Sequence, residues 1–308
     1  MLGAAVAARL THTGHDVRTL QRRSTGALDE ICGSITDNPT VTRAVEGVDA
    51  VVHLAAKVSL TGDAHEFWRV NVEGTAGLLA AASAAGVRRF VQVSSPSVAH
   101  SGASIVGDGA RPADPVRARG EYARTKAEGE LLAIAADRPG FSVVAVRPHL
   151  VWGPGDTQLV ARIVERARRG RLPLLGHGAA LIDSTYIDNA ASAIAQAMER
   201  ADAVHGNFYV VTNGEPRPVA ELLYGMCAAA GVPAPRWSVP PSVAREAGAI
   251  VETIWRGDDE PPMTRFLAEQ LSTAHWFDQR RTRRDLHWAP DISLDEGFRR
   301  LAAYFSSR

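Results

Sequence analysis

Short apolar runs alternate with helical patterns along the first half of the chain. Apolar residues recur at helical spacing in residues 2–10, 64–85 and 122–136. Runs of strand length accompany them at residues 16–20, 48–56, 89–95 and 142–147. Strands that alternate with helices pair in parallel, and the helices cover both faces of the sheet. The pattern therefore predicts a doubly wound α/β fold.

The first predicted helix has neither a strand nor an N-cap before it. In doubly wound (Rossmann-type) folds, a glycine-rich turn joins the first strand to the first helix, and backbone N–H groups there bind a pyrophosphate. Gly3 fits the last glycine of a Gly-x-x-Gly-x-x-Gly turn. We expect the missing strand and the earlier glycines to precede Met1 in the complete protein. The alternative is a chain that begins with a surface helix, and the DNA immediately upstream would distinguish the two.

Beyond about residue 151 the alternation gives way to a sequence rich in proline and tryptophan. We expect residues 1–150 to form a dinucleotide-binding domain that is truncated at its N-terminus. Residues 151–308 are expected to form mostly a smaller C-terminal substrate lobe, with some chain returning to the core sheet. Apolar residues with few charges recur at 239–241, in a predicted helix at 243–255, and at 261–266 and 273–278. This composition favours a lipophilic substrate, and the alternative is ordinary core packing.

The overall composition excludes several classes of function. Lysine plus arginine (34) equals aspartate plus glutamate (34), so no net positive field attracts nucleic acid or an anionic membrane. No apolar run reaches the roughly 18 residues of a membrane span, and no secretory signal is present, which favours the cytoplasm. Cys32 and Cys227 lie far apart without metal-ligand neighbours, so we expect buried thiols and no metal site.

The most specific chemical pattern is Tyr122-x-x-x-Lys126, preceded by Ser95 at the end of a predicted strand. Residues four apart share one face of a helix, so the phenol and the ammonium are expected to point into the same space. A lysine and a positively charged nicotinamide both favour the phenolate of a tyrosine, whose pKa is ordinarily about 10. Tyr122 would exchange a proton with a substrate oxygen that Ser95 holds, while hydride passes to or from the cofactor. The alternative is a solvated pair on a helix surface.

Several further motifs, taken together with this pattern, resemble the extended short-chain dehydrogenase/reductase family, also called the NAD-dependent epimerase/dehydratase family. They span almost the whole chain and comprise residues 47–56 (GVDAVVHLAA), 71–75 (NVEGT), 94–95 (SS), 147–156 (RPHLVWGPGD) and 186–190 (YIDNA). The resemblance implies that Asn71 belongs to a catalytic hydrogen-bond relay and that Lys126 binds the nicotinamide ribose. It also implies a cofactor lined by Leu54, Ala55, Ala56, Tyr122 and Pro148, and a homodimer built on paired helices.

The choice of cofactor is expected to depend on the end of the strand at residues 16–20. A carboxylate there would accept from the ribose hydroxyls of NAD and repel the extra phosphate of NADP. The sequence instead has Gln21, Arg22 and Arg23, and two guanidiniums could clamp that phosphate. We therefore predict NADP(H) over NAD(H), and the alternative is a pair of arginines on a solvated loop. Ser34 stands where the family usually has an aspartate near the adenine.

The C-terminal third resembles the 3β-hydroxysteroid dehydrogenase-like branch of this family, which includes 2-alkyl-3-oxoalkanoate reductases. The likeness is carried by residues 265–266, 275–278, 285–290 and 294–297. It implies interconversion of a secondary alcohol and a ketone on a lipophilic molecule, such as a 3-oxo or 3-hydroxy lipid or a sterol acid.

Two other functions remain open at this point. A nucleotide-sugar epimerase or dehydratase would need charged groups for a diphosphate, and Arg171, His177 and Arg217 are candidates. A non-catalytic dinucleotide sensor is the other alternative, because function resides in sites rather than in folds. His53 and His149 are expected to be structural, on a buried strand and beside the pocket.

Overall fold

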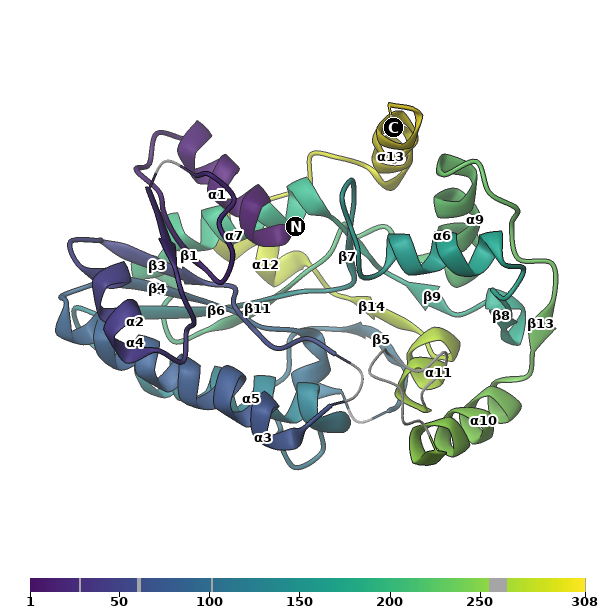
Figure 1. Ribbon diagram of the computed structural model, residues 1–308, viewed down its shortest axis with the longest axis horizontal. Coiled ribbons are helices and arrows are strands. Elements are labelled where there is room, and N and C mark those ends of the chain that lie inside the picture. Colours follow the sequence, from purple (N-terminus) through teal and green to yellow (C-terminus); the bar gives the residue numbers. More distant parts are fainter. Residues whose placement is uncertain (28, 60–61, 101, 255–264, 308) are drawn as a thin grey trace.

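The computed structural model describes residues 1–308 except 28, 60–61, 101, 255–264 and 308. Its centre is a parallel sheet with the strand order β11–β6–β4–β3 (Figure 1). These strands are β3 (Ala50–His53), β4 (Arg89–Val93), β6 (Ser142–Pro148) and β11 (Phe208–Val211). A second parallel pair joins β1 (Arg18–Gln21) to β2 (Asp29–Cys32). Within the described ranges no strand pairs with both β1 and β3.

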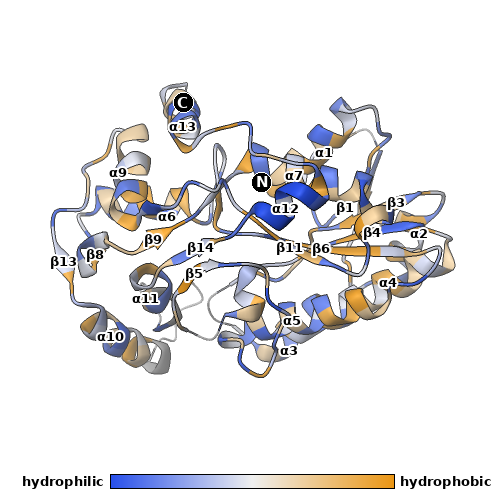
Figure 2. Ribbon diagram, turned by 180° about the vertical axis from the view of Figure 1, so that it is seen from behind, coloured by the Kyte–Doolittle hydropathy of each residue, from blue (hydrophilic) through white to orange (hydrophobic). Residues whose placement is uncertain are grey.

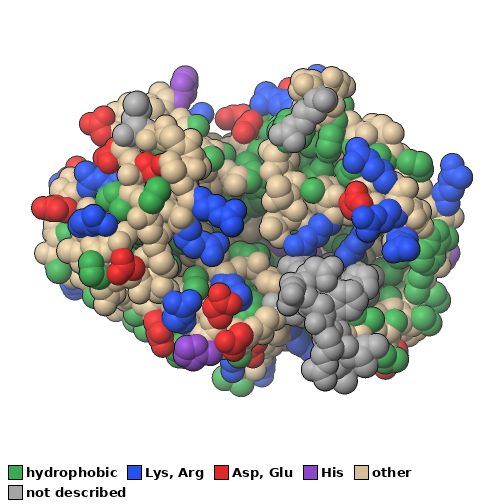
Figure 3. Space-filling view, in the orientation of Figure 1, with side chains coloured by type: hydrophobic (Ala, Val, Ile, Leu, Met, Phe, Trp, Pro, Cys, Tyr) green, Lys and Arg blue, Asp and Glu red, His purple; other side chains and the backbone are tan. Residues whose placement is uncertain are grey.

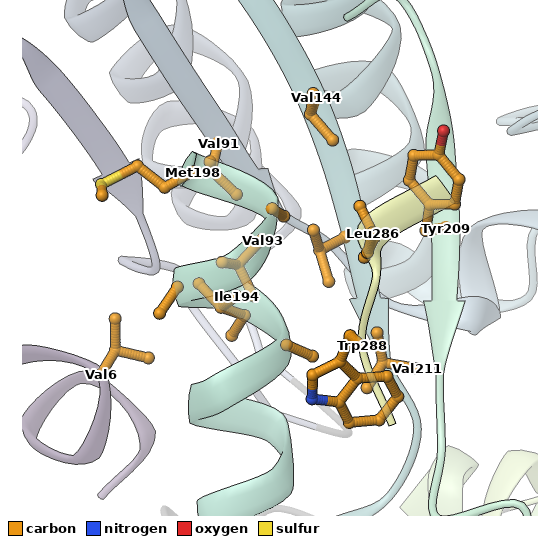
Figure 4. Close-up of a cluster of buried hydrophobic side chains, with 14 of the residues drawn as sticks. Val6, Val91, Val93, Val144, Ile194, Met198, Tyr209, Val211, Leu286 and Trp288 are labelled. Atoms are coloured by element: carbon orange, nitrogen blue, oxygen red, sulfur yellow. The ribbon is translucent and has the colours of Figure 1, made fainter. Parts of the chain in front are cut away.

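Helices cover both faces of the central sheet, as the alternating pattern predicted (Figure 1). One face carries α2 (Asn38–Val45), α4 (Gly74–Ala84) and α5 (Gly120–Ala135). The other carries α1 (Leu2–His12), α7 (Ile187–Glu199), α8 (Ala201–Val204) and α12 (Arg280–Leu286). Figure 4 shows side chains of the second face, where Ile194 of α7 and Leu286 of α12 pack against valines of the strands. Burial of these apolar side chains stabilises the layers.

The central strands are apolar because both of their faces are covered. Val143, Val144 and Val146 of β6 are fully buried, and Figure 2 shows β4, β6 and β11 as mainly hydrophobic ribbons. By contrast α12, with the sequence RRTRRDL, is strongly hydrophilic in the same view. It lies on the surface and buries only Thr282 and Leu286.

The second half of the chain, together with the strand at residues 105–108, builds a group of smaller sheets and helices beside the central sheet (Figure 1). One mixed sheet has the order β12–β9–β14–β5, and two short parallel pairs join β7 to β10 and β8 to β13. The strands are β5 (Ile105–Asp108), β7 (Val151–Trp152), β8 (Leu174–Leu175), β9 (Leu181–Ile182), β10 (Thr185–Tyr186), β12 (Arg217–Pro218), β13 (Ser238–Val239) and β14 (His275–Phe277). The helices are α6 (Val160–Arg168), η3 (Gly176–Gly178), α9 (Val219–Ala229), α10 (Pro241–Ile254), α11 (Arg265–Ser272) and α13 (Leu294–Ser306).

The chain between these elements returns to the central sheet, where α7, β11 and α12 complete the core. The helix predicted at 243–255 corresponds to α10, although residues 255 and 261–264 lie outside the described part of the chain. None of the described helices combines the length and the apolar composition that a bilayer span requires.

Three features of the fold differ from the sequence prediction. The expected helix at 64–85 is divided into α3 (Ala64–Trp68), a π-helical turn η1 (Arg69–Glu73) and α4. The strand β2 and the helix α2 were not predicted, because the short run Asp-Glu-Ile-Cys of β2 lacks strand periodicity. The expectation of two buried thiols is wrong for Cys32, which is exposed at the end of β2, whereas Cys227 is buried in α9.

Candidate active site

The side chains of Ser95 and Tyr122 meet at the carboxyl end of β4. Ser95 follows that strand and caps the short helix η2 (Pro96–Ala99), with its Oγ accepting from the Ser97 amide at 3.3 Å. Tyr122 lies in the first turn of α5, and the Ser95 side chain is close enough to its phenol to lower the pKa of that phenol. Carboxyl ends of parallel strands are where ligands bind in doubly wound sheets. The predicted pair of serine and tyrosine is therefore brought together at a position suited to a ligand.

Lys126 lies one helical turn beyond Tyr122 and points toward the same strand end. Its side chain is 4% exposed, and Nζ donates to the backbone oxygen of Val93 at 2.7 Å. Burial lowers the pKa of Lys126 to about 8, and the nearby Glu130 carboxylate partly offsets this effect. The ammonium is thus anchored two residues before Ser95 and is close to its deprotonation range at neutral pH.

The pKa of Tyr122 differs from the sequence expectation. We expected the Lys126 ammonium to favour the phenolate, but burial of the side chain raises the pKa of Tyr122 instead. The nearby Ser95 side chain acts in the opposite direction and is the weaker influence. In this state the phenol retains its proton, which suits a group that donates a proton to a developing oxyanion.

Asn71 lies in the π-helical turn η1, and its amide is fully engaged by two neighbouring segments. Its Oδ1 accepts from the backbone nitrogen of Lys57 at 2.8 Å, and its Nδ2 donates to the Lys57 oxygen at 3.2 Å. Nδ2 also donates to Thr125 Oγ1, between Tyr122 and Lys126 in α5, at 3.0 Å. The side chain therefore joins the loop after β3 to the helix that carries the tyrosine and the lysine. π-turns of this kind recur at functional sites.

The turn η1 and the helix α5 approach each other very closely at Gly129. A Cβ atom at this position would lie 2.5 Å from the backbone oxygen of Asn71, which is shorter than any real contact of that kind. A glycine in a helix ordinarily costs about 1 kcal/mol relative to alanine. Its presence here allows the backbones to approach and keeps Asn71 within reach of Thr125.

The other predicted cofactor residues lie at strand ends or in the first turn of α1. Leu54, Ala55 and Ala56 follow β3 directly, and Ala55 is exposed. Pro148 ends β6 and is buried. Gly3 lies in the first turn of α1 and has free space at the position of a Cβ, and no acidic residue lies in that turn. Arg22 and Arg23 are exposed beyond the end of β1.

These residues fit a nicotinamide dinucleotide. An ammonium has three donor positions, and those of Lys126 other than the one directed at Val93 have no acceptor among the residues the structure describes. Within the described ranges, the buried hydroxyl of Ser94, beside Ser95, has no hydrogen-bond partner either. Buried donors without acceptors are uncommon unless a ligand completes them. The face shown in Figure 3 is hollowed near its centre, with Lys and Arg side chains beside the hollow.

Two buried histidines, His100 and His275, and the partly buried His149 form a cluster that connects β14 to the segments after β4 and β6. The ring of His275 contacts those of His100 and His149, with centroid distances of 4.7 and 6.0 Å. His149 Nδ1 forms a hydrogen bond with the backbone oxygen of Asp183 at 2.7 Å. His53, on β3, instead contacts Thr75 Oγ1 at 3.0 Å. Both histidines that we expected to be structural therefore have partners within the protein framework.

Acid is expected to destabilise the fold through these imidazoles. Burial lowers the pKa of His53 and His275 to about 3 and that of His149 to about 4. Below about pH 6.5 these imidazoles bind protons in the unfolded chain but remain neutral in the folded chain. The free energy of unfolding therefore falls as the pH drops toward 4. We expect a loss of about 1–2 kcal/mol per histidine at about pH 5.

Urea denaturation at about pH 7.5 and pH 5 measures this loss. His275→Asn is expected to make the free energy of unfolding less dependent on pH, whereas the exposed control His12→Gln should leave the dependence as in the wild type. The same pH dependence in the wild type and in His275→Asn would contradict the prediction for His275.

Two acidic residues near the site were missed by the sequence reasoning. Glu130 of α5 forms a buried ion pair with Arg147 of β6. Glu30 of β2 reaches the loop beyond the end of β1, where it accepts from Ser24 and Thr25. Glu130 could have been found, because it continues the four-residue spacing of Tyr122 and Lys126. No local pattern links Glu30 to Gln21, since the contact depends on the pairing of two strands.

Comparison with known proteins identifies relatives of this chain. Residues 1–212 match the NAD dependent epimerase/dehydratase family. A 2-alkyl-3-oxoalkanoate reductase of Stenotrophomonas maltophilia is 41% identical over 98% of this chain and 96% of its own length. A 3β-hydroxysteroid-dehydrogenase/decarboxylase (isoform 2) of Arabidopsis thaliana is 31% identical over 91% of this chain and 52% of its own length.

Solved structures agree on the fold. A dTDP-glucose 4,6-dehydratase of Streptomyces venezuelae, crystallised with NAD, superimposes with a TM-score of 0.76 at 23% identity. The superposition covers 100% of this chain and 94% of the dehydratase. Together with the match over residues 1–212, these similarities show that the chain belongs to the NAD-dependent epimerase/dehydratase family.

Proposed function

We propose that this protein is an NADP(H)-preferring oxidoreductase that interconverts a secondary alcohol and a ketone on a lipophilic substrate. The observation that carries the proposal is the proximity of the Tyr122 phenol to the Ser95 side chain, beside the buried ammonium of Lys126. The 41% identity to a 2-alkyl-3-oxoalkanoate reductase supports a 3-oxo lipid as the substrate class. The test is consumption of reduced cofactor with a panel of 3-oxo lipids, including 2-alkyl-3-oxoalkanoates.

In the reductive direction each side chain has a separate task. When bound, the nicotinamide cofactor supplies hydride to the carbonyl carbon. Ser95 donates a hydrogen bond to the substrate oxygen, and Tyr122 transfers its proton to that oxygen as negative charge develops there. Lys126 keeps its ammonium at the end of β4 and binds the ribose hydroxyls with its remaining donors. Asn71 holds the loop at Lys57 and the helix α5 in register, and so acts as a positioning residue.

The nucleotide-sugar alternative receives less support from the candidate diphosphate groups. Arg217 is already paired with Asp295 at 2.8 Å and with Glu215 at 3.4 Å. His177 lies in the turn η3 with a backbone φ of 61°, near Ser238. The non-catalytic alternative is tested by titrating the chain with nicotinamide cofactors and then assaying the lipid panel. Binding without turnover of any 3-oxo lipid would favour a sensor.

The preference for NADP(H) is expected to depend on Arg22 and Arg23. Neither guanidinium has an ion-pair or hydrogen-bond partner in the part of the chain that the structure describes, so both are free to bind the 2′-phosphate. Replacing both arginines by alanine removes charge-assisted hydrogen bonds of about 1.5–3 kcal/mol each. We expect KM for NADPH to rise about 10²–10⁴-fold and KM for NADH to change little.

The control is Arg88→Ala, which removes an exposed arginine paired with Asp49 on the surface. A wild-type protein that turns over NADH faster than NADPH at equal concentration would refute the cofactor preference and leave the oxidoreductase proposal intact.

A cytoplasmic homodimer with the domain division 1–150 and 151–308 completes the proposal, and sedimentation of the purified chain tests the oligomeric state.

A further inference from the structure

The carboxylate of Glu30 organises the loop that follows β1. Strands β1 and β2 pair in parallel with Thr19 opposite Glu30, which places the Glu30 side chain near the end of β1. One carboxylate oxygen accepts from the Thr25 backbone nitrogen at 2.8 Å and from Thr25 Oγ1 at 2.9 Å. The other accepts from Ser24 Oγ at 2.5 Å, and Gln21 Nε2 also donates to the carboxylate. One side chain therefore holds both ends of the loop.

The loop is closed by further hydrogen bonds around the same carboxylate. Gln21 Nε2 donates to Thr25 Oγ1 at 2.7 Å, and the amide of Gly26 donates to Ser24 Oγ at 3.3 Å. Gly26 has a φ of +78°, a conformation that glycine adopts without strain. Hydrogen bonds from the Ser24 hydroxyl, which has the largest effect, and from the Thr25 amide lower the pKa of Glu30 to about 2. The carboxylate is thus ionised, and engaged by the loop, over the whole working range of pH.

The two residues between these anchors differ from them in having no side-chain partner among the residues that the structure describes. Arg22 and Arg23 stand between Gln21 and Ser24, and both side chains are exposed. Neither forms an ion pair with Glu30 or with any other residue in the described ranges. The Glu30 carboxylate contacts the loop that carries both arginines, yet hydroxyl and amide groups, rather than the guanidiniums, donate to it. The loop therefore presents uncompensated positive charge beyond the end of β1.

We propose that Glu30 is a specificity-determining positioning residue, which shapes the 22–26 loop so that Arg22 and Arg23 present a site for the 2′-phosphate of NADP. The inference rests on the proposed cofactor preference and adds a residue that touches neither the phosphate nor the ribose. It also assigns a purpose to an acid in a region where acids ordinarily select NAD. Glu30 does not act as such an acid, because its oxygens are directed at the loop.

A Glu30 that faced the ribose would change NADP⁺ affinity in the opposite direction when it is substituted. If Glu30 faced the ribose, its charge would repel a 2′-phosphate, and removing the charge would strengthen NADP⁺ binding. If Glu30 shapes the loop, removing the carboxylate frees the loop, and the guanidiniums lose their fixed position. Ordering them on binding then costs conformational entropy, which weakens NADP⁺ binding. The direction of change in affinity therefore separates the two roles.

The test is equilibrium titration of the purified full chain with NADP⁺ and with NAD⁺. Binding is detected by tryptophan fluorescence or by calorimetry. For Glu30→Ala we expect the Kd of NADP⁺ to rise about tenfold, and that of NAD⁺ to stay within about twofold. Glu30→Gln keeps one acceptor oxygen for the Thr25 amide and is expected to retain most of the preference. The matched control is Asp29→Ala, next along the same strand, whose exposed carboxylate pairs with Arg18 at 3.0 Å.

Each outcome decides one of the questions. If Glu30→Ala prefers NADP⁺ over NAD⁺ as strongly as the wild type does, or more strongly, the proposed role of Glu30 is overturned. The cofactor preference itself is then unaffected. If Glu30→Ala weakens the binding of NADP⁺ and NAD⁺ equally, Glu30 has only a structural role, and the proposed specificity role is likewise overturned. A wild-type protein without preference for NADP⁺ refutes the proposed cofactor, and the role of Glu30 with it, but not the oxidoreductase activity. Hydrogen exchange at the Thr25 amide, expected to accelerate in Glu30→Ala, checks that the loop has been released.

Discussion

Replacing Tyr122 by phenylalanine is expected to lower the turnover number by about 10²–10⁴-fold, the usual contribution of a positioned general acid. The substitution keeps the ring in its place and removes only the hydroxyl that meets Ser95. Without that hydroxyl, the developing oxyanion has no proton donor held within hydrogen-bond reach. The measurement is kcat at saturating reduced cofactor with the best substrate of the 3-oxo lipid panel.

Cofactor binding and folding are the controls for this variant. Lys126 keeps its bond to the Val93 oxygen whether or not the phenol is present, so the Kd of the cofactor should change little. Tyr224→Phe makes the same chemical change at an exposed position on α9 and should leave turnover unaltered. If Tyr122→Phe turned over within about twofold of the wild type, Tyr122 would not be the proton donor.

Breaking the buried ion pair between Glu130 and Arg147 is expected to cost about 3–5 kcal/mol of folding free energy. The side chains are 2% and 1% exposed, and Arg147 Nε donates to Glu130 Oε2 at 2.8 Å. Arg147 also donates to the backbone oxygen of Arg111 at 2.6 Å and lies 4.6 Å from the ring centroid of Phe208. Glu130→Ala leaves this guanidinium buried without its carboxylate, and the free energy of unfolding in urea measures the cost.

Two variants show whether the cost comes from burial of the remaining charge. Glu121→Ala breaks a more exposed ion pair with Arg124 on the same helix and is expected to cost less than about 1 kcal/mol. Replacing both members of the buried pair, Glu130→Leu with Arg147→Met, removes the unpaired charge and should be less destabilising than Glu130→Ala. Equal losses for Glu130→Ala and Glu121→Ala would show that the buried pair contributes no more than the exposed one.

This pair also bears on the geometry of the active site. Glu130 is one helical turn beyond Lys126 on α5, and Arg147 immediately precedes Pro148 on β6. The ion pair therefore fixes the helix that carries Tyr122 and Lys126 against the sheet. A loss of turnover in Glu130→Ala that follows the loss of folded protein is consistent with this structural role.

The sequence by itself determined the layers of the fold and the candidate residues of the site. Alternation of apolar strands with helices depends on local periodicity, so it predicted the doubly wound sheet without knowledge of any contact. The same is true of Tyr122 and Lys126, because a four-residue spacing fixes a shared face as soon as the segment is helical. Ser95 was identified from its place at the end of a strand, since strand ends meet at one edge of the sheet.

Only the tertiary structure decided which distant groups meet these residues and with what effect. Strand pairing brings Glu30 to the loop beyond Gln21, and a π-turn inside an expected helix directs Asn71 toward Lys57 and Thr125. Burial, which no local spacing encodes, raises the pKa of Tyr122 where the sequence had suggested the opposite. The physical reason is the same in each case: periodicity is a property of one segment, whereas desolvation and hydrogen bonds across the fold depend on how segments pack together.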